Sequence, residues 1–324
     1  MKKKILISVL CLLFIVVFNF ALPRLMPGDP VLMLLGMDDS IVSQSQYEYY
    51  YHELGLDKSL PSQFINYLLD IVSGNLGYSY HYDDSVASLI GNHLPVTLYL
   101  SIPSILVASL LSLFIGSYMG YKKGSLPERG MTWINIVVHA IPSFLWALLF
   151  LYLFAFKLRW FPLGALNSRG ITAGSPGFLY DRFYHLALPV LVLILLSFPS
   201  KYMMMVNRVG EERKMRYVIY ARSQGLSSFQ IVYSHILKNI LPQFITMAGM
   251  SFGSIFTGSL IVENIFSLQG MGMHISEAIT ARDYPVLEGC LLISSLVVVL
   301  FTLLADLVCF FIDPKVRYKV YEEK

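Results

Sequence analysis

The chain has 324 residues, of which 56% are hydrophobic and only 14% are charged, and its formal net charge at pH 7 is +3. A soluble fold of this length needs more polar surface than this composition supplies, so the composition excludes an ordinary soluble globular protein. We expect membrane lipids around the chain and no nucleic-acid partner.

Six segments contain enough apolar residues for a bilayer-spanning helix, which needs roughly 20. The sequence therefore predicts an all-α polytopic membrane protein of about six transmembrane helices. In chain order the segments are Ile5–Leu22, Leu98–Tyr121, Trp133–Phe156, Leu186–Val206, Phe244–Val262 and Gly289–Ile312. The first segment follows three lysines and also suits a signal peptide, but no small-x-small cleavage site precedes Leu22, so we interpret it as a span.

These spans divide the chain into four parts. We expect a first transmembrane helix over 1–22, an extracytoplasmic cap over 23–95, a five-helix membrane domain over 96–313 and a tail over 314–324. The membrane domain includes a polar loop over 207–243. The two termini, the connection between spans two and three and the polar region from Lys201 to Lys238 together hold seventeen lysines and arginines, whereas the segments on the opposite side hold seven. Cytoplasmic segments are enriched in these residues, so both termini and the polar loop are predicted to be cytoplasmic.

The cap segment is acidic and rich in turn signals such as Gly55, Pro61, Gly74 and Gly77. Its negative charge suits a cationic substrate or partner, but it is also what the topology rule leaves outside the cell. Short helices between the turns are consistent with a cap over the mouth of the membrane domain.

The polar stretch over 215–242 predicts a two-helix hairpin. Gly225 lies where a first helix would end, because glycine takes the left-handed capping conformation without a Cβ penalty. Ser227 and Gln230 have the spacing of a capping box, and Leu226 can pack on Ile231 as a hydrophobic staple. Basic residues on both helices suit a protein partner or the membrane surface, although an ordinary positive loop explains them equally well.

Motifs for chemistry are missing from the sequence. No G-x-x-x-x-G-K-[ST] phosphate loop occurs, so the chain has no ATP site of that kind. No H-E-x-x-H motif and no paired His and Cys at metal spacing occur either. We expect no enzyme activity, cofactor or metal in this chain.

Ionisable residues within spans are costly and are therefore candidates for function. His139 and Asp306 are the clearest, and His139 is interpreted as a neutral interhelical hydrogen-bonding group in preference to a proton carrier. Two isolated groups argue against proton coupling. Asp306 lies near the cytoplasmic end of the last span, where it can reach a polar partner.

Small and helix-breaking residues mark the places where helices can shift. Proline interrupts the backbone ladder, and glycine permits close helix approach. We take as candidate gating or pore residues Pro142, Gly249, Gly253, Gly258 and Glu263. Tight packing alone is the alternative explanation for the glycines.

Short motifs in a fixed order carry a family resemblance over nearly the whole chain. They include Pro27-Gly28-Asp29-Pro30, Leu54-Gly55-Leu56-Asp57, Gly74-Asn75-Leu76-Gly77, Ile141-Pro142-Ser143-Phe144, Tyr220-Ala221-Arg222-Ser223-Gln224-Gly225-Leu226, Val262-Glu263-Asn264-Ile265-Phe266, Arg282-Asp283-Tyr284-Pro285 and Asp313-Pro314-Lys315. The chain resembles the membrane permease subunits of binding-protein-dependent ABC importers, in the branch that handles oligopeptides, dipeptides and nickel.

The resemblance implies a coupling loop over 217–242 that inserts into a groove of a separate cytoplasmic ATPase. The residues assigned to docking are Tyr220, Ala221, Arg222, Gln224, Gly225, Leu226 and Ser227. It also implies the partners of this chain, which are a second permease subunit, two ATPase subunits and an extracytoplasmic substrate-binding protein. Gln224 replaces the lysine that is usual before the glycine, and Ile219 replaces the glutamate that opens the general motif.

Two other classes of function compete with this interpretation. An autonomous secondary transporter or channel predicts internal repeats and clustered ion-binding groups, and we see neither. A membrane scaffold would use the same basic hairpin without moving a solute. Within the importer class, the substrate is predicted to be a peptide or a related small solute such as a nickel chelate.

Overall fold

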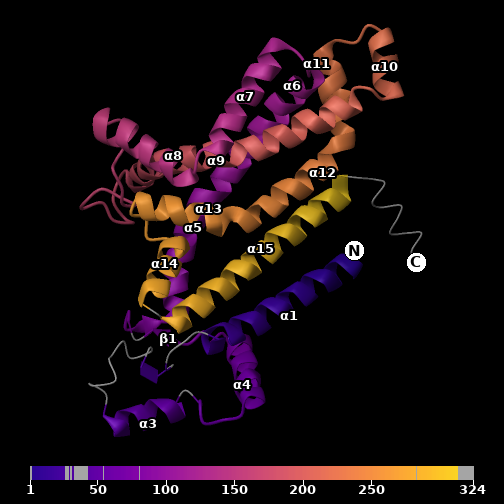
Figure 1. Cartoon of the computed structure of the whole chain (residues 1–324). Helices are drawn as coiled ribbons and strands as arrows, with labels where there is room; N and C mark the ends of the chain where they lie inside the picture. Colours follow the sequence, from indigo (N-terminus) through magenta and orange to yellow (C-terminus); the bar gives the residue numbers. More distant parts are fainter. Residues whose placement is uncertain are drawn as a thin grey trace. The chain divides into compact units, whose positions relative to one another are not determined.

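The computed structural model describes residues 2–25, 29, 31–32, 43–53, 55–79, 81–281 and 283–312. The predicted tail over 314–324, Arg282, most of Pro27-Gly28-Asp29-Pro30 and the Asp313-Pro314-Lys315 motif lie outside the described residues. The chain forms two compact units, Met1–Thr97 with Gln269–Val299 and Leu98–Leu268 with Leu300–Lys324. Helices α5 (Val86–Leu111) and α15 (Tyr284–Ile312) each contribute residues to both units (Figure 1).

The first unit combines membrane helices with the cap segment. Its remaining elements are α1 (Lys2–Leu25), α3 (Gln44–Glu53), α4 (Leu60–Ser73), β1 (Tyr78–Ser79), β2 (Asp84–Ser85) and α14 (Met271–Ala281). The two short strands pair antiparallel, with Tyr78 opposite Ser85. The Asn19 amide donates to the Glu288 carbonyl at 3.4 Å, which holds α1 beside the first half of α15. The cap predicted from the sequence is thus partly helical.

Both ends of helix α4, in the cap segment, are set by local sequence signals. It starts after Ser59 with proline in its first turn, where a missing N–H costs nothing. It ends at Gly74, whose φ of +80° is the left-handed capping conformation. Both ends were readable as turn signals.

The second unit holds most of the membrane domain. Its helices are α6 (Ser117–Tyr121), α7 (Leu126–Ala140), α8 (Ser143–Phe150), α9 (Phe178–Glu212), α10 (Arg216–Ser223), α11 (Ser228–Gln230), α12 (Leu237–Met250) and α13 (Ile255–Ile265). Three π-helical segments, Ser112–Gly116, Leu151–Lys157 and Ile231–Ile236, continue α5, α8 and α11, and a 3₁₀ turn over Ser251–Ser254 joins α12 to α13.

Glycine permits a close helix contact between α9 and the segment that precedes and includes α6. A Cβ on Gly120 would lie 2.8 Å from the Val206 carbonyl oxygen, and one on Gly116 would lie 2.8 Å from the Met205 side chain. Only glycine lets α6 and the preceding π-helical segment approach α9 this closely.

Three helical segments among the described residues are long and apolar enough to cross a membrane: Val86–Tyr121, Phe178–Glu212 and Tyr284–Phe311. The bent pair α7 and α8 with its extension gives a fourth if it counts as one crossing, and α1 contributes a shorter apolar stretch, Leu10–Ala21. The all-α, polytopic class is confirmed.

The third predicted span is not one helix. Residues 133–156 are divided between α7 and the α8 segment, which meet at 99°. Proline at 142 disfavours helical conformation at Ile141 and cannot donate a backbone hydrogen bond, so the helix ends at Ala140 and a new one starts after Pro142. The fifth predicted span is also interrupted, by the 3₁₀ turn at Ser251–Ser254.

Candidate docking surface

The hairpin between α9 and α12 has the local structure that its sequence predicts. Helix α10 ends at Ser223, and Gly225 takes φ of +80°. Ser227 accepts from the Gln230 backbone N–H at 3.3 Å, and the Gln230 side chain accepts from the Ser227 N–H at 3.0 Å. The capping box is therefore complete, and it starts α11.

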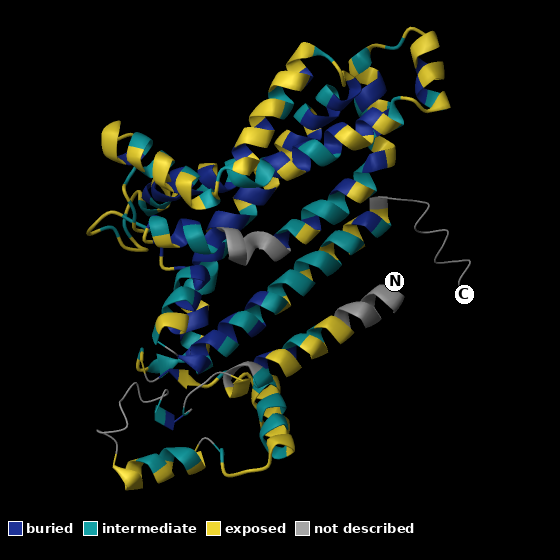
Figure 2. Ribbon diagram, viewed as in Figure 1, coloured by how far each residue is buried: buried dark blue, intermediate teal, exposed yellow. Residues whose placement is uncertain are grey.

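The two sides of the hairpin differ in exposure (Figure 2). Val218 and Ala221 are buried, with Ala221 only 4% exposed. Tyr220 in α10 and Phe229 in α11 are 64% and 65% exposed, and Ile219 in α10 is also exposed. We call these three exposed apolar residues, Ile219, Tyr220 and Phe229, the hairpin patch. Large exposed apolar side chains on a polar hairpin are typical of a protein interaction site.

The buried side of the hairpin is continuous with the membrane helices. One cluster of buried residues, which we call the hairpin core, contains residues of the hairpin, α9, α12, α6 and the π-helical segment after α5. Its members are Leu113, Tyr121, Met205, Val209, Val218, Ala221, Ile231, Val232, Ile236, Ile240 and Phe244. Leu226 is half-buried and packs against this cluster, as the predicted hydrophobic staple requires. A close-packed core transmits displacement of one element to its neighbours.

Two arginines fasten the hairpin to the turn after α6. Arg213 donates to the backbone carbonyls of Tyr121 and Lys123 at 2.9 and 3.0 Å. Arg222 donates to the Tyr121 hydroxyl at 3.0 Å and lies over the same ring. Gln224 is exposed and donates to the Tyr220 hydroxyl at 2.8 Å. Arg222 therefore holds the hairpin in place as well as adding charge beside the patch.

Tyr217 adds a second fastening, on the α9 side. Its hydroxyl donates to the Glu212 carboxylate at 2.8 Å, and the Asn239 amide reaches the same oxygen at 3.4 Å. Burial raises the pKa of Tyr217 to about 12, so the hydroxyl keeps its proton and remains a donor. The ends of α9, α10 and α12 are joined through this one carboxylate.

The predicted gating residues belong to several different elements. Pro142 is at the break between α7 and α8, Gly249 is in α12, Gly253 is in the 3₁₀ turn, and Gly258 and Glu263 are in α13. A Cβ at Gly249 would collide with Ala305, so this glycine permits close packing of α12 on α15. Glu263 is fully buried. Their role in a pathway stays a prediction.

The intramembrane polar residues also lie apart. His139 is exposed in the last turn of α7 and lines an open cavity of about 410 Å³ with α9; within the described part of the chain it has no hydrogen-bond partner. The interhelical hydrogen bond of His139 stays a prediction. Asp306 is half-buried in α15 and interacts with its surroundings.

Sequence reasoning missed a buried lysine and a polar cluster. Lys201, counted among the cytoplasmic cations, is 3% exposed inside α9, where its ammonium donates to the Ser197 hydroxyl at 2.8 Å.

The polar cluster is centred on Asp181. Its carboxylate accepts from the Ser168 hydroxyl and backbone N–H at 2.6 and 2.8 Å, and His185 lies 3.7 Å from it. The only signal was the i, i+4 spacing of Asp181 and His185. Because the serine donates to the carboxylate, this cluster fastens the 158–177 loop to α9.

One serine pattern needs its structural context. Gly249-Met250-Ser251-Phe252-Gly253 fits the letters of a G-x-S-x-G nucleophile elbow. That motif requires a sharp strand-to-helix turn. Ser251 instead follows α12 and donates to the Met247 carbonyl at 3.0 Å, so the pattern is part of a helical segment.

Two family models together match most of the chain. Residues 112–318 match the family of binding-protein-dependent transport system inner membrane components, and residues 1–101 match the N-terminal family of the same systems' membrane components. The chain belongs to this family. The hairpin and the hairpin core therefore lie in an inner membrane transport component.

Relatives of this transport component cover nearly its whole length. It is 30% identical over 319 residues to the "Di/tripeptide transport system permease protein DppB" of Pseudomonas aeruginosa, covering 94% of each chain. It is 29% identical to the "Oligopeptide transport system permease protein AppB" of Bacillus subtilis, covering 98% of each. The "Peptidoglycan transport system permease protein YejB" of Agrobacterium fabrum is 31% identical over 88% of this chain and 78% of its own.

Proposed function

We propose that this transport component is the permease subunit of an ATP-driven importer that moves peptides, or a related small solute, across the cytoplasmic membrane. Family membership and the printed names of the relatives support the solute class. The observation that carries the proposal is the two-sided hairpin, which exposes a hydrophobic patch while its other side is packed into the hairpin core.

The proposed partners follow from the family and from this chain's own surface. ATP is hydrolysed by two separate cytoplasmic ATPase subunits, which bind the hairpin, and a second permease subunit and an extracytoplasmic substrate-binding protein complete the importer. In this proposal both termini and the hairpin are cytoplasmic. ATP-driven closure of the ATPases favours one state of the permease through their differential affinity for the hairpin.

Purification of the full-length protein from its native membranes tests this proposal. We expect ATPase subunits and a second permease to co-purify, and the complex to hydrolyse ATP. Phe229→Asp places a charge in the hairpin patch and is expected to abolish ATPase co-purification, because an unpaired charge at the core of an interface is costly.

The matched control is Leu126→Asp, since Leu126 is 82% exposed at the start of α7 outside the patch. It should retain the ATPases. A lone protein without ATPase after mild cross-linking would contradict the proposal and favour the autonomous transporter or the scaffold. Equal loss in both variants would contradict the assignment of the patch.

A further inference from the structure

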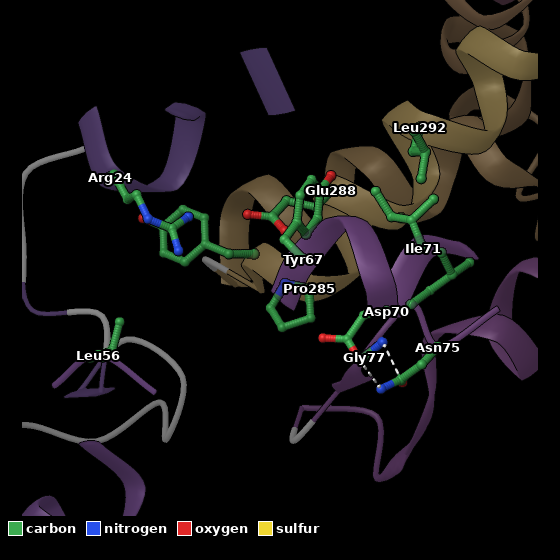
Figure 3. Close-up of a pocket in the computed structure, with 13 residues that line it drawn as sticks. Arg24, Leu56, Tyr67, Asp70, Ile71, Asn75, Gly77, Pro285, Glu288 and Leu292 are labelled. Atoms are coloured by element: carbon green, nitrogen blue, oxygen red, sulfur yellow. Dashed lines mark hydrogen bonds between the residues drawn. The ribbon is translucent and has the colours of Figure 1, made fainter. Parts of the chain in front are cut away.

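The first unit contains a cavity of about 250 Å³ between α4, the end of α1 and the first turns of α15. Figure 3 shows Arg24, Tyr67 and Glu288 towards one end of this pocket and Asp70 with Asn75 towards the other. The rest of the wall is largely apolar, for example at Ile71 and Leu292. A small apolar pocket with a few polar groups is the usual form of a ligand site.

Glu288 is a polar group of this pocket that has no partner among the described residues. Within the described residues its carboxylate has neither a hydrogen bond nor an ion pair, and Arg24 acts on it only through space. Glu288 is half-buried in the pocket wall. A carboxylate partly removed from water without a partner carries a desolvation cost, so such groups are normally paired. The structure thus holds an acceptor ready for a ligand.

Arg24 does not serve as that partner because it is engaged elsewhere. Its guanidinium donates to the Gln63 side chain at 2.8 Å and to the Phe20 carbonyl at 2.7 Å, and it stacks over the Phe20 ring. Asp70 likewise has a partner, since the Asn75 amide donates to it at 3.2 Å. Of Arg24, Asp70 and Glu288, only Glu288 has no hydrogen-bond or ion-pair partner among the described residues.

The Tyr67 hydroxyl is a second group in this pocket that is available to a ligand. Its hydroxyl is buried, and no hydrogen-bond partner for it is found among the described residues. Burial raises the pKa of Tyr67, and the nearby negative charge of Glu288 adds to the effect, so the hydroxyl stays neutral. A neutral hydroxyl can accept a hydrogen bond from a ligand.

A carboxylate and a hydroxyl oxygen in one pocket suit a donor that carries several protons and a positive charge. We propose that this pocket binds a primary ammonium group, with Glu288 and Tyr67 as its acceptors, and that the ammonium is the amino terminus of a peptide. The ammonium provides three donors, which match the carboxylate and the hydroxyl and leave one for water. The peptide part of this inference rests on the proposed function; the ammonium part does not.

The experiment measures binding of three probes to the full-length protein in lipid nanodiscs, with any subunits that co-purify, by saturation-transfer NMR. Trialanine, N-acetyl-trialanine and n-butylamine differ in the ammonium and in the peptide backbone. We expect trialanine to bind, and its acetylated form, which has no charge at that end, to bind about ten- to a hundredfold more weakly, the range for a hydrogen bond to a buried charge.

Glu288→Gln keeps the shape of the side chain and removes its charge. We expect trialanine binding to fall by about ten- to a hundredfold and the melting temperature to stay the same or rise, because an unpaired, half-buried charge is lost. Asp70→Asn, in the same pocket, is the control and should bind trialanine nearly as the unaltered protein does. Weaker binding without lower stability separates a ligand site from a structural one.

Equal binding of trialanine and N-acetyl-trialanine, or unchanged binding by Glu288→Gln, would overturn the proposal. Binding of n-butylamine as tight as that of trialanine would support the ammonium site and overturn its assignment to peptides. These measurements need no ATPase, and the co-purification test does not involve Glu288. Failure of one proposal is therefore distinguishable from failure of the other.

Discussion

Gly225 is the residue at which local backbone geometry and proposed coupling meet. Its φ of +80° is unfavourable for a side chain by about 1–2 kcal/mol, and no atom lies within 4 Å of the position a Cβ would take. Strain at this residue would therefore come from the backbone alone. A substitution there tests the turn without disturbing packing.

We expect Gly225→Val to leave the protein in the membrane while ATP hydrolysis by the co-purified complex no longer drives uptake. The turn between α10 and α11 opens and misplaces the hairpin patch. The measurement is peptide uptake in cells against ATPase activity of the purified complex. Gly177→Val is the control, because Gly177 has φ of +84° and equally open space. Normal uptake by Gly225→Val would rule out this role of the turn.

His274 in α14 gives a second prediction at the scale of one side chain. It faces Tyr82 from the turn between β1 and β2, His93 from α5 and Glu277 from its own helix. Burial and, to a smaller extent, the neighbouring His93 lower the pKa of His274 from 6.5 to about 4. The folded protein thus holds this imidazole neutral at pH values where the unfolded chain binds a proton.

The free energy of unfolding should therefore fall as pH decreases from 6.5 towards 4, and this contribution should be constant above that range. We expect the melting temperature of the solubilised protein to decrease from pH 7 to pH 5. His274→Gln should show a smaller decrease, since it has no proton to bind. The same pH response in both proteins would contradict the prediction. Thermal unfolding in one detergent at both pH values measures it.

At the scale of elements, the contact between α6 and α9 is set by a single missing side chain. Gly120→Ala would place a Cβ 2.8 Å from the Val206 carbonyl oxygen and 2.9 Å from the Val209 Cβ. Both neighbours belong to α9, and Val209 is part of the hairpin core. We expect a loss of stability of roughly 1–3 kcal/mol, as for other overpacked contacts.

The matched control for this substitution is Gly130→Ala, since Gly130 is exposed in α7 with no atom within 4 Å of a Cβ. Alanine there should stabilise the helix by about 0.5–1 kcal/mol. Thermal unfolding of the two variants gives opposite shifts if the contact limits helix approach. Shifts in the same direction would show that α6 and α9 can separate without cost.

At the scale of the whole molecule, composition and the order of apolar segments were enough to predict the class of fold. The hairpin was also predicted in detail, because Gly225, Ser227 and Gln230 act through contacts with near neighbours in the sequence. Pro142 was identified as a breaker, but the angle of 99° at α7 and α8 was not, since hydropathy does not record direction.

The groups that sequence reasoning missed depend on contacts between distant residues. In the described part of the chain Glu288 has no partner and Arg24 bonds to Gln63 instead, which no local sequence pattern predicts. Lys201 was counted as a loop cation because its burial within α9 depends on the helices around it. Ser168 in the loop and Asp181 in α9 are separated by thirteen positions in the sequence. Pairings of this kind are set by packing and appear only in the structure.

The two-sided hairpin has a consequence for how such importers diversify. Residues that fix its position, such as Val218, Tyr217 and Arg222, are separate from the exposed residues of the proposed docking patch, Ile219, Tyr220 and Phe229. Substitution on the outward side leaves the fold's supports intact. Under the proposed function, a few substitutions in the hairpin patch can therefore change which ATPase subunit binds. The packing of the hairpin against the membrane helices is unchanged by them.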